Sequence, residues 1–335
     1  MTELRLAFLG FGNVGQALGR LLLRKQDELE QEYGITFRVT GISTGRHGAV
    51  IDPQGIELTN ALAAMERGDR LGTPMEGLTF VQSCPADVLF ESIPVNYATG
   101  QPAVDYLRAA LGCKIHAITA NKGPVVHAYR ELTALAAEQG RKFFFESAVM
   151  DGAPIFSLFR AALPGAKLLS LRGILNSTTN LILGRMEDGE SFDQAVAYAQ
   201  SIGIAETDPS GDVDGWEAAV KVAALATVLM GVPLKPQDVA REGIRLITPE
   251  RIQQALAEGK RWKLVCTARR QDEDVVGRVA PELVSPDSPL YGVQGTSSIV
   301  TFETDVLPEL SIVEGNPGPE TTAYGMLADF INAVR

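Results

Sequence analysis

The stretch RLAFLGFGNVGQALGRLLL (residues 5–23) decides the fold of the first part of the chain, because three glycines separate a short apolar run from a segment with helical spacing of apolar residues. Gly10, Gly12 and Gly15 fit the pattern G-x-G-x-x-G. In such a loop the first glycine permits a tight turn, the second lets a pyrophosphate approach the backbone, and the third lets helix and strand pack closely. This order predicts a dinucleotide site, with a glycine turn in an ordinary strand–helix unit as the alternative.

The residues around this loop indicate which dinucleotide is bound. The N-terminus of the following helix offers unpaired N–H groups to phosphates, and Asn13 and Val14, between the second and third glycines, are expected to contact the cofactor. In an NAD-binding fold of this kind, a carboxylate at the end of the second strand binds the ribose 2′-hydroxyl. Here the second strand ends in GISTGRHG (41–48). This stretch has no carboxylate and carries Arg46, whose guanidinium suits a 2′-phosphate. We therefore expect NADP, with NAD as the alternative if Arg46 is only a solvated loop residue.

Length and composition set limits on the class of protein. The chain has 335 residues, enough for two domains with substantial cores. Hydrophobic residues make up 45% and charged residues 21%, as in a soluble globular protein, and no apolar run is long enough to span a bilayer. The formal net charge of −11 argues against general affinity for a phosphate backbone. Neither nucleic acid nor a membrane is expected as a partner.

Cysteine and histidine are scarce. The three cysteines are far apart and lack C-x-x-C spacing, which argues against a disulfide framework or a zinc site. The N-terminus carries no basic segment with a small-residue cleavage site, so we expect a reduced, cytoplasmic protein. The three histidines are scattered, so proton transfer is expected from lysine, aspartate or glutamate.

Strand and helix signals alternate along the first part of the chain. Apolar runs and helical spacing predict strands at 37–43, 86–93, 114–120 and 141–149, and helices at 103–111 and 128–140. This alternation is typical of an α/β fold with a doubly wound parallel (Rossmann) sheet, which binds ligands at the carboxyl ends of its strands.

The pattern changes in the second part. Helices are predicted at 190–202 and 215–230, followed by alternating strands at 261–270 and 273–281, which indicates an α+β domain. We expect a dinucleotide-binding domain at 1–140, a substrate-binding and catalytic domain at 141–310, and a C-terminal helix at 311–335 that returns to the first domain.

Polar residues in apolar settings are the candidates for chemistry. TANKGP (119–124) places Lys122 at the end of a predicted buried strand, where the alternative is a solvated loop lysine. In a later segment, acidic residues precede a long apolar helix that contains one lysine, Lys221. Desolvation lowers the pKa of an ammonium group toward the range that suits general acid–base catalysis. The alternative for Lys221 is a surface pair with Glu217 at i,i+4 spacing. The polar run in RGILNSTTNLIL (172–183) suits either a helix cap or a substrate contact.

Five segments in this order resemble homoserine dehydrogenase: GFGNVG, TANKGP, FESAVMDGAPI, GILNSTTN and GIAETDPSGDVDGWEAAVK. The resemblance runs over nearly the whole chain, and the last segment is highly specific. It implies reversible hydride transfer between NAD(P)H and L-aspartate 4-semialdehyde, which gives L-homoserine on the route to threonine and methionine. The alternatives are another NAD(P)-dependent oxidoreductase of a small amino acid or hydroxy acid, and a catalytically silent nucleotide-binding sensor.

The same resemblance assigns roles to three residues of the proton path. Lys221 would be the acid that protonates the aldehyde oxygen as hydride arrives. Asp212 would support Lys221, and Lys122 would shape the path and contact the nicotinamide end.

Further roles follow for the substrate and the cofactor. By resemblance, Glu206 and Glu217 would face the substrate ammonium group, and Thr178 with adjacent amides would hold its polar groups. Ser177 stands where the family commonly has glycine, at the place where cofactor and substrate meet, and Glu217 stands where aspartate is usual. The family's G-x-G-A-G before the last helix is altered to EGNPGPETTA, which keeps Gly315 as a cofactor contact.

The resemblance also implies a bound cation, a homodimer and the absence of a regulatory domain. FESAVMDGA resembles the family's monovalent-cation turn, in which sodium would be held by the Glu146 carboxylate and the carbonyls of Val149, Asp151 and Ala153. The protein would be a homodimer paired through the second domain. We expect no fused aspartate kinase and no small threonine-sensing domain, and hence weak inhibition by threonine.

Overall fold

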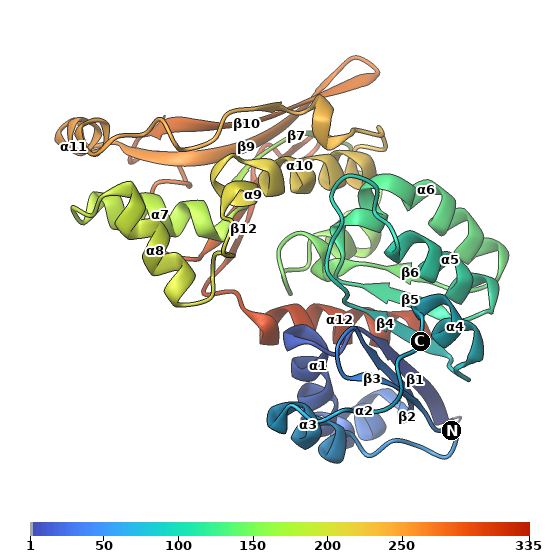
Figure 1. The fold of residues 1–335 in the computed structure, drawn as a ribbon. Helices are drawn as coiled ribbons and strands as arrows, with labels where there is room; N and C mark the ends of the chain where they lie inside the picture. The colour runs from blue at the N-terminus through green and yellow to red at the C-terminus, as the bar shows by residue number, and fades with distance from the viewer. Residues whose placement is uncertain (1–2) are drawn as a thin grey trace. The chain divides into compact units, whose positions relative to one another are not determined.

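The computed structural model describes residues 3–335, which divide into two compact units. Unit 1 comprises the chain up to Pro154 together with Gly318–Arg335, and unit 2 comprises Ile155–Pro317. Figure 1 labels most of the helices and strands of each unit. The C-terminal helix is therefore part of the unit that contains the glycine loop.

Unit 1 is built on a six-stranded sheet in the order β3-β2-β1-β4-β5-β6. All strands run parallel except β3, which pairs antiparallel with β2 at one edge. The predicted α/β fold with a doubly wound parallel sheet is confirmed, with β3 as an addition. The strands are β1 Glu3–Leu9, β2 Thr36–Thr44, β3 Gly48–Ile51, β4 Val88–Glu91, β5 His116–Thr119 and β6 Phe143–Phe144.

Helices connect these strands and bury their apolar faces. In α1, for example, leucines recur at helical spacing and Leu18 and Leu22 are fully buried. The helical segments of unit 1 are α1 Asn13–Arg24, α2 Gln26–Tyr33, α3 Leu58–Arg67, α4 Gly77–Ser83, α5 Ala103–Gly112, α6 Lys122–Glu138, the 3₁₀ turn η1 Glu146–Ala148, and α12 Pro319–Val334.

Two elements of unit 1 differ from their predicted ranges. The strand predicted at 141–149 is wrong beyond Phe144, because the chain turns into η1 and the N–H of Glu146 donates to the Asp329 carboxylate of α12 (2.6 Å). The helix predicted at 128–140 corresponds to the second part of α6, because Ala128 is non-helical (φ −138°) and marks a kink, while α6 itself begins already at Lys122. Its first turn forms because Asn121 Oδ1 accepts the N–H of Gly123 (2.9 Å) and caps the helix.

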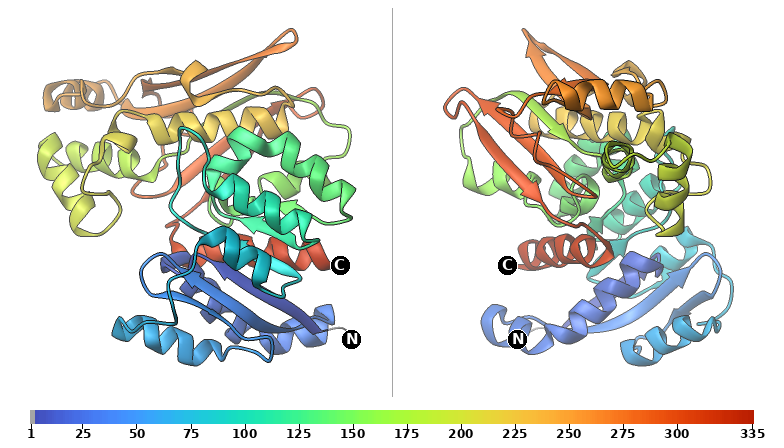
Figure 2. Two further views of the ribbon diagram at one scale, coloured as in Figure 1. Left: turned by 45° about the vertical axis from the view of Figure 1, so that its right-hand side comes forward. Right: turned by 90° about the vertical axis from the view of Figure 1, so that its left-hand side faces the viewer.

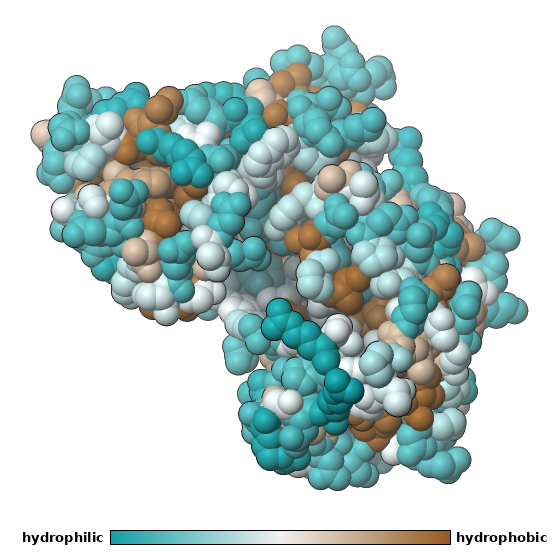
Figure 3. Space-filling view, in the orientation of Figure 1, coloured by the Kyte–Doolittle hydropathy of each residue, from teal (hydrophilic) through white to brown (hydrophobic). Residues whose placement is uncertain are grey.

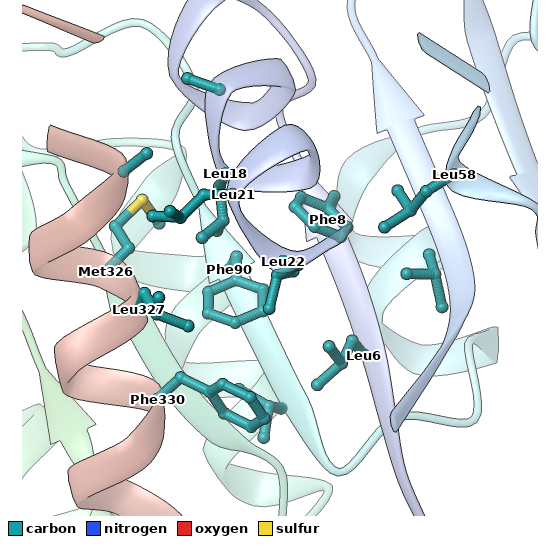
Figure 4. Packing of buried hydrophobic residues seen from close by; sticks show 14 of the residues in the cluster. Leu6, Phe8, Leu18, Leu21, Leu22, Leu58, Phe90, Met326, Leu327 and Phe330 are labelled. Carbon is teal, nitrogen blue, oxygen red and sulfur yellow. The ribbon is translucent and has the colours of Figure 1, made fainter. Parts of the chain in front are cut away.

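The last helix of the chain, α12, completes the core of unit 1. Met326, Leu327 and Phe330 project from it toward α1 and the sheet (Figure 4). The rings of Phe330 and Phe90, the latter in β4, lie edge to face with their centroids 5.8 Å apart. Burial of these apolar side chains is the main force that holds α12 in place.

Unit 2 contains a second six-stranded sheet, in the order β12-β11-β7-β9-β10-β8. Its pairs are antiparallel except that the two-residue strand β8 runs parallel to β10, and α10 packs against β9 and β10 (Figure 2). The predicted α+β character of this part is confirmed. The strands are β7 Leu168–Ile174, β8 Ala240–Arg241, β9 Arg261–Gln271, β10 Asp274–Val284, β11 Ser298–Thr304 and β12 Leu310–Glu314.

The helices of unit 2 lie between these strands in the chain. They are the π-helical turn η2 Leu158–Ala162, α7 Ser177–Glu187, α8 Phe192–Ser201, α9 Ser210–Val213, α10 Trp216–Leu229, the 3₁₀ turn η3 Pro236–Asp238 and α11 Pro249–Ala257. Every residue of α10 from Ala218 to Thr227 is buried, as expected of a helix that is apolar on all sides.

The surface is largely polar. Hydrophilic residues cover most of the face seen in Figure 3, and hydrophobic residues occur there in small groups. Among residues 3–335, no helix combines the length and the apolar character needed to cross a membrane.

Candidate active site

The glycine loop between β1 and α1 is shaped by close backbone approaches. Gly10 has a φ of +98°, and a Cβ there would lie 2.7 Å from the carbonyl carbon of Ser92, just after β4. A Cβ on Gly15 would lie 2.5 Å from the carbonyl oxygen of Gly10. Neither position accepts a side chain unless the backbone moves, so the strand–turn–helix geometry itself requires both glycines.

Gly12 has a different environment, since a Cβ there would meet nothing within 4 Å. It is the exposed N-cap of α1, and within the described residues no side chain caps this helix. The N–H groups of Asn13 and Val14 are not used by the helix itself, and the helix dipole places partial positive charge at this end. The open surface above Gly12 therefore suits the pyrophosphate of a dinucleotide.

Arg46 lies in the exposed turn between β2 and β3. The end of β2 is held beside the glycine loop, because the N–H of Gly10 donates to the carbonyl oxygen of Ser43 (2.9 Å). Thr44 Oγ1 closes the turn by accepting the N–H of His47 (2.7 Å). Arg46 takes part in no ion pair among residues 3–335, so its guanidinium can take an anionic ligand.

A buried polar network joins the carboxyl ends of β4 and β5. Glu91 is 0% exposed and accepts hydrogen bonds from the N–H of Ile93 (2.8 Å), the Thr119 hydroxyl and the Asn121 amide (3.4 Å). Burial raises the pKa of Glu91 to about 7, although the hydrogen bonds act in the opposite direction. Since Asn121 also caps α6, the network fixes the position of Lys122, the first residue of α6 after β5.

The predicted cation ligands share one buried turn after β6, packed against α12. Glu146, Val149 and Ala153 are 3%, 2% and 7% exposed. Asp151 has a φ of +39°, and its carboxylate accepts the hydroxyl of Thr322. Among residues 3–335, no cluster of three or more histidines, cysteines or carboxylates could hold a metal, so a cation here would need carbonyl oxygens in addition to the Glu146 carboxylate.

Lys221 is the charged centre of unit 2. Its Nζ donates to the carbonyl oxygen of Leu175 (2.7 Å) and lies 3.7 Å from Glu217 Oε1. The Lys221 side chain is 11% exposed and that of Glu217 is 24% exposed. The lysine is therefore both buried and paired with the glutamate one turn before it.

Asp212, in α9, joins this cluster. Its Oδ1 accepts the side-chain amide of Asn176 (2.6 Å). The pKa of Asp212 is raised to about 7, first by burial and then by the charge of Glu217, while hydrogen bonds from Asn176 and Thr178 lower it. The cluster can therefore hold or release a proton near neutral pH.

The polar run after β7 forms the N-terminus of α7. Asn176 caps the helix, because its Oδ1 accepts the N–H of Thr179 (2.8 Å), and Ser177 is the first helical residue. Since Asn176 and Thr178 also hydrogen-bond Asp212, the run is both a helix cap and a wall of the acidic cluster.

Two predicted residues of unit 2 lie outside the cluster. Glu206 is exposed, and its side chain makes no hydrogen bond or ion pair within the described part of the chain. Gly315 follows β12 and is exposed, and a Cβ there would meet nothing within 4 Å. The predicted residues that the structure does bring together around the buried lysine are Lys221, Asp212, Glu217 and Thr178.

Residues 154–331 match the homoserine dehydrogenase family, and residues 10–146 match the NAD-binding domain of homoserine dehydrogenase. The chain belongs to the homoserine dehydrogenase family.

Full-length relatives agree with this assignment to the homoserine dehydrogenases. The chain is 38% identical over 331 residues to homoserine dehydrogenase of Methanocaldococcus jannaschii, covering 97% of this chain and 96% of the relative. It is 33% identical over 340 residues to the NAD(+)-dependent homoserine dehydrogenase of Pseudomonas canavaninivorans, covering 99% and 96%. It is also similar to a hyperthermophilic archaeal homoserine dehydrogenase in complex with NADPH, with a TM-score of 0.84 and 29% identity over 99% of this chain and 98% of that one.

The NAD-binding domain of this homoserine dehydrogenase lies within unit 1, and the residues there fit a dinucleotide. Space is open above Gly12, the helix leaves its first N–H groups unused, and Arg46 offers a guanidinium beside the end of β2. β2 itself, Thr36–Thr44, contains no carboxylate.

Sequence reasoning missed two buried residues of this homoserine dehydrogenase. Glu91 interrupts the apolar run ADVLFESI, and Lys263, 1% exposed, interrupts the strand RWKLV. A charged residue within a run predicted to be a buried strand is the signal that could have found both, because such groups are rarely buried unless they are hydrogen-bonded.

Proposed function

We propose that this chain catalyses the reversible reduction of L-aspartate 4-semialdehyde to L-homoserine with NAD(P)H, in the biosynthesis of threonine and methionine. The observation that carries the proposal is the buried Lys221 ammonium group within a carboxylate cluster, in a chain whose other unit holds a dinucleotide loop. A bound nicotinamide supplies the hydride that reduces the aldehyde carbon.

Lys221 is proposed as the general acid. Its Nζ gives a proton to the aldehyde oxygen as the carbon is reduced, so that the oxygen becomes the hydroxyl of homoserine, and it takes that proton back in the oxidative direction. The carbonyl oxygen of Leu175 (2.7 Å) and Glu217 Oε1 (3.7 Å) hold the ammonium group in place. Asp212, whose pKa is raised to about 7 by burial and by the charge of Glu217, is proposed to pass the proton onward.

The remaining roles are proposed from charge and from family resemblance. Glu217 and the exposed Glu206 suit the ammonium group of the substrate, because carboxylates offset its positive charge. Thr178 is proposed to hold the polar groups of the substrate, and Ser177 and Gly315 to contact the cofactor. Lys122, at the first turn of α6, is proposed to shape the proton path at the nicotinamide end.

Initial rates of NADP⁺ and NAD⁺ reduction with L-homoserine at alkaline pH test the function. Lys221→Ala should lower kcat by about 10²- to 10⁴-fold, the usual contribution of a general acid or base, with NADP⁺ binding retained. Lys235→Ala removes an exposed lysine of the same unit and should leave the rate unchanged. Absence of homoserine-dependent reduction with either cofactor would refute the proposal.

We propose NADP as the preferred cofactor, on the observations that β2 lacks a carboxylate and that Arg46 follows it in a fixed turn. Arg46→Ala should lower kcat/KM for NADP⁺ by about tenfold and that for NAD⁺ by less than about twofold, because a charge-assisted contact to the 2′-phosphate is lost. Arg24→Ala, at the exposed C-terminal end of α1, is the control. Equal losses with both cofactors would contradict the role of Arg46.

We also propose a sodium-like cation at the turn after β6, held by the Glu146 carboxylate and the carbonyls of Val149, Asp151 and Ala153. The buried oxygen-rich turn supports it, since hard cations prefer oxygen ligands. The thermal midpoint should rise in sodium chloride relative to choline chloride at equal ionic strength, and Glu146→Gln should abolish the difference. A wild-type midpoint that is the same in both salts would reject the site.

We propose a homodimer that pairs through the second sheet. One face of this sheet packs against α10, and Gly277 lies on it, since a Cβ there would lie 3.0 Å from Val222. The neighbouring residue Val276 therefore lies on the opposite face, where it is 47% exposed. The register places Val313, 62% exposed, on that same side. Light scattering should give twice the chain mass of 35.9 kDa, and a monomer at micromolar concentration would contradict the dimer.

A further inference from the structure

Lys263 is a buried lysine that the proposed mechanism does not use. It lies in β9 and is 1% exposed. Its Nζ donates to Asn180 Oδ1 (2.8 Å) and to the carbonyl oxygen of Val293 (2.6 Å). A buried ammonium group must find such acceptors, because leaving it unpaired away from water is very unfavourable.

Asn180 extends this contact in two directions. Its Nδ2 donates to the carbonyl oxygen of Gly295 (3.0 Å), in the loop that follows Val293. Its backbone N–H donates to the carbonyl oxygen of Asn176 (3.3 Å), one turn earlier in α7. The ammonium group therefore ties both this loop and the first turn of α7 to β9.

The same part of the chain holds the cluster around Lys221. The Leu175 carbonyl oxygen accepts the Lys221 ammonium (2.7 Å), and the Asn176 amide donates to Asp212 Oδ1 (2.6 Å). A hydrogen-bonded path thus runs from Lys263 to the cluster, entirely within unit 2.

The charges that face Lys263 come from α7 and β9. Glu187 raises its pKa and Arg261 lowers it, and these two side chains form an ion pair of 3.5 Å. Since their effects oppose each other, burial prevails and lowers the pKa of Lys263 to about 8. The two hydrogen bonds are therefore the contacts that define where the ammonium group lies.

We propose that Lys263 is a positioning residue for the Lys221–Asp212 cluster, which it holds in place through Asn180 and the first turn of α7. The inference rests on the proposed function, because it gives Lys263 a part in the same reaction.

Lys263→Met tests this role, since methionine is similar in length but cannot donate to Asn180. With L-homoserine as substrate, kcat should fall about 10- to 100-fold, as expected for a small misplacement of catalytic groups, while KM changes less than about threefold. The pH profile of kcat should also shift, and so should the ¹³C-carboxyl titration of Asp212. If the folded variant keeps the wild-type kcat, pH midpoint and carboxyl titration, the positioning role is overturned.

The matched control is Thr227→Val, which removes a buried hydroxyl of α10 that accepts the N–H of Leu234 (3.2 Å). It should lower the thermal midpoint but move neither the pH profile nor the carboxyl titration. Where Lys263→Met does not fold, Lys263→Leu, which also cannot donate to Asn180, is judged by the same readouts. If the wild type does not oxidise homoserine, the proposed function fails, whereas the titration of Asp212 still decides whether Lys263 positions the cluster.

Discussion

Glu91 shows how two opposing effects set the protonation of a single side chain. Its carboxyl group is 0% exposed, and burial favours the neutral acid. Donors on Ile93, Thr119 and Asn121 favour the carboxylate. Because burial prevails and the pKa is raised to about 7, the charged and neutral forms of Glu91 coexist near neutral pH.

The raised pKa of Glu91 predicts a pH-dependent stability. Between the ordinary value of 4.5 and about 7, the unfolded chain releases this proton whereas the folded chain keeps it, so unfolding becomes more favourable as pH rises. Stability from Glu91 is therefore present below pH 4.5 and lost as pH rises to about 7. Relative to Glu91→Gln, the wild type should lose about 3 kcal/mol across this range, measured by urea unfolding.

The control is Glu138→Gln, which neutralises an exposed glutamate near the end of α6 and should show no such trend. A difference between wild type and Glu91→Gln that stays constant from pH 4.5 to pH 8 would contradict the assigned pKa.

Residues within contiguous motifs were predictable, and residues that owe their position to the sheet were not. Gly10 and Gly15 follow from the geometry of the turn, because Gly10 has a φ of +98° and a Cβ on Gly15 would lie against the carbonyl oxygen of Gly10. Lys221 was predictable because its apolar neighbours are adjacent in one helix. A charge inside a predicted strand marks Glu91 and Lys263, but their hydrogen-bond partners come from strands and loops distant in sequence, which no local pattern shows.

At the scale of elements, α12 is a helix whose stability depends on packing against the parallel sheet. Phe330 is 0% exposed and contacts the ring of Phe90. Phe330→Ala should lower the free energy of unfolding of unit 1 by about 3–5 kcal/mol, since it removes apolar contacts and leaves a cavity. Tyr324→Ala, on the same helix but 56% exposed, should lower it by about 1 kcal/mol or less. Equal losses in denaturant unfolding would show that α12 does not close this core.

Element boundaries failed where tertiary hydrogen bonds replaced local ones. The run RKFFFESAV has strand-like composition, yet β6 ends at Phe144 because Asp329, far along the chain, captures the N–H of Glu146. The part of α6 before the kink at Ala128, residues 122–127, was not predicted, because its cap comes from Asn121, whose side chain is itself held by Glu91. Periodicity predicted the interior of each helix and strand better than its ends.

At the scale of the whole molecule, the two units have separate cores. Phe8, Leu22 and Phe330 belong to a cluster in unit 1, whereas Val265 and Ile299 belong to one in unit 2. The dinucleotide loop lies in the first unit and the Lys221 cluster in the second. A dinucleotide held mainly by the glycine loop should therefore stabilise unit 1 more than unit 2.

Hydrogen exchange with and without NADP⁺ tests this separation. At a hundredfold excess over Kd, NADP⁺ should add about 2.7 kcal/mol to the protection of β1 and β4, and much less to that of α11 in unit 2. Gly12→Asp should abolish the effect without harming the fold, because a Cβ there meets nothing within 4 Å and aspartate is a good N-cap, yet its charge repels the pyrophosphate. Equal protection of both units would mean that they unfold together, and protection that persists in Gly12→Asp would place the dinucleotide elsewhere.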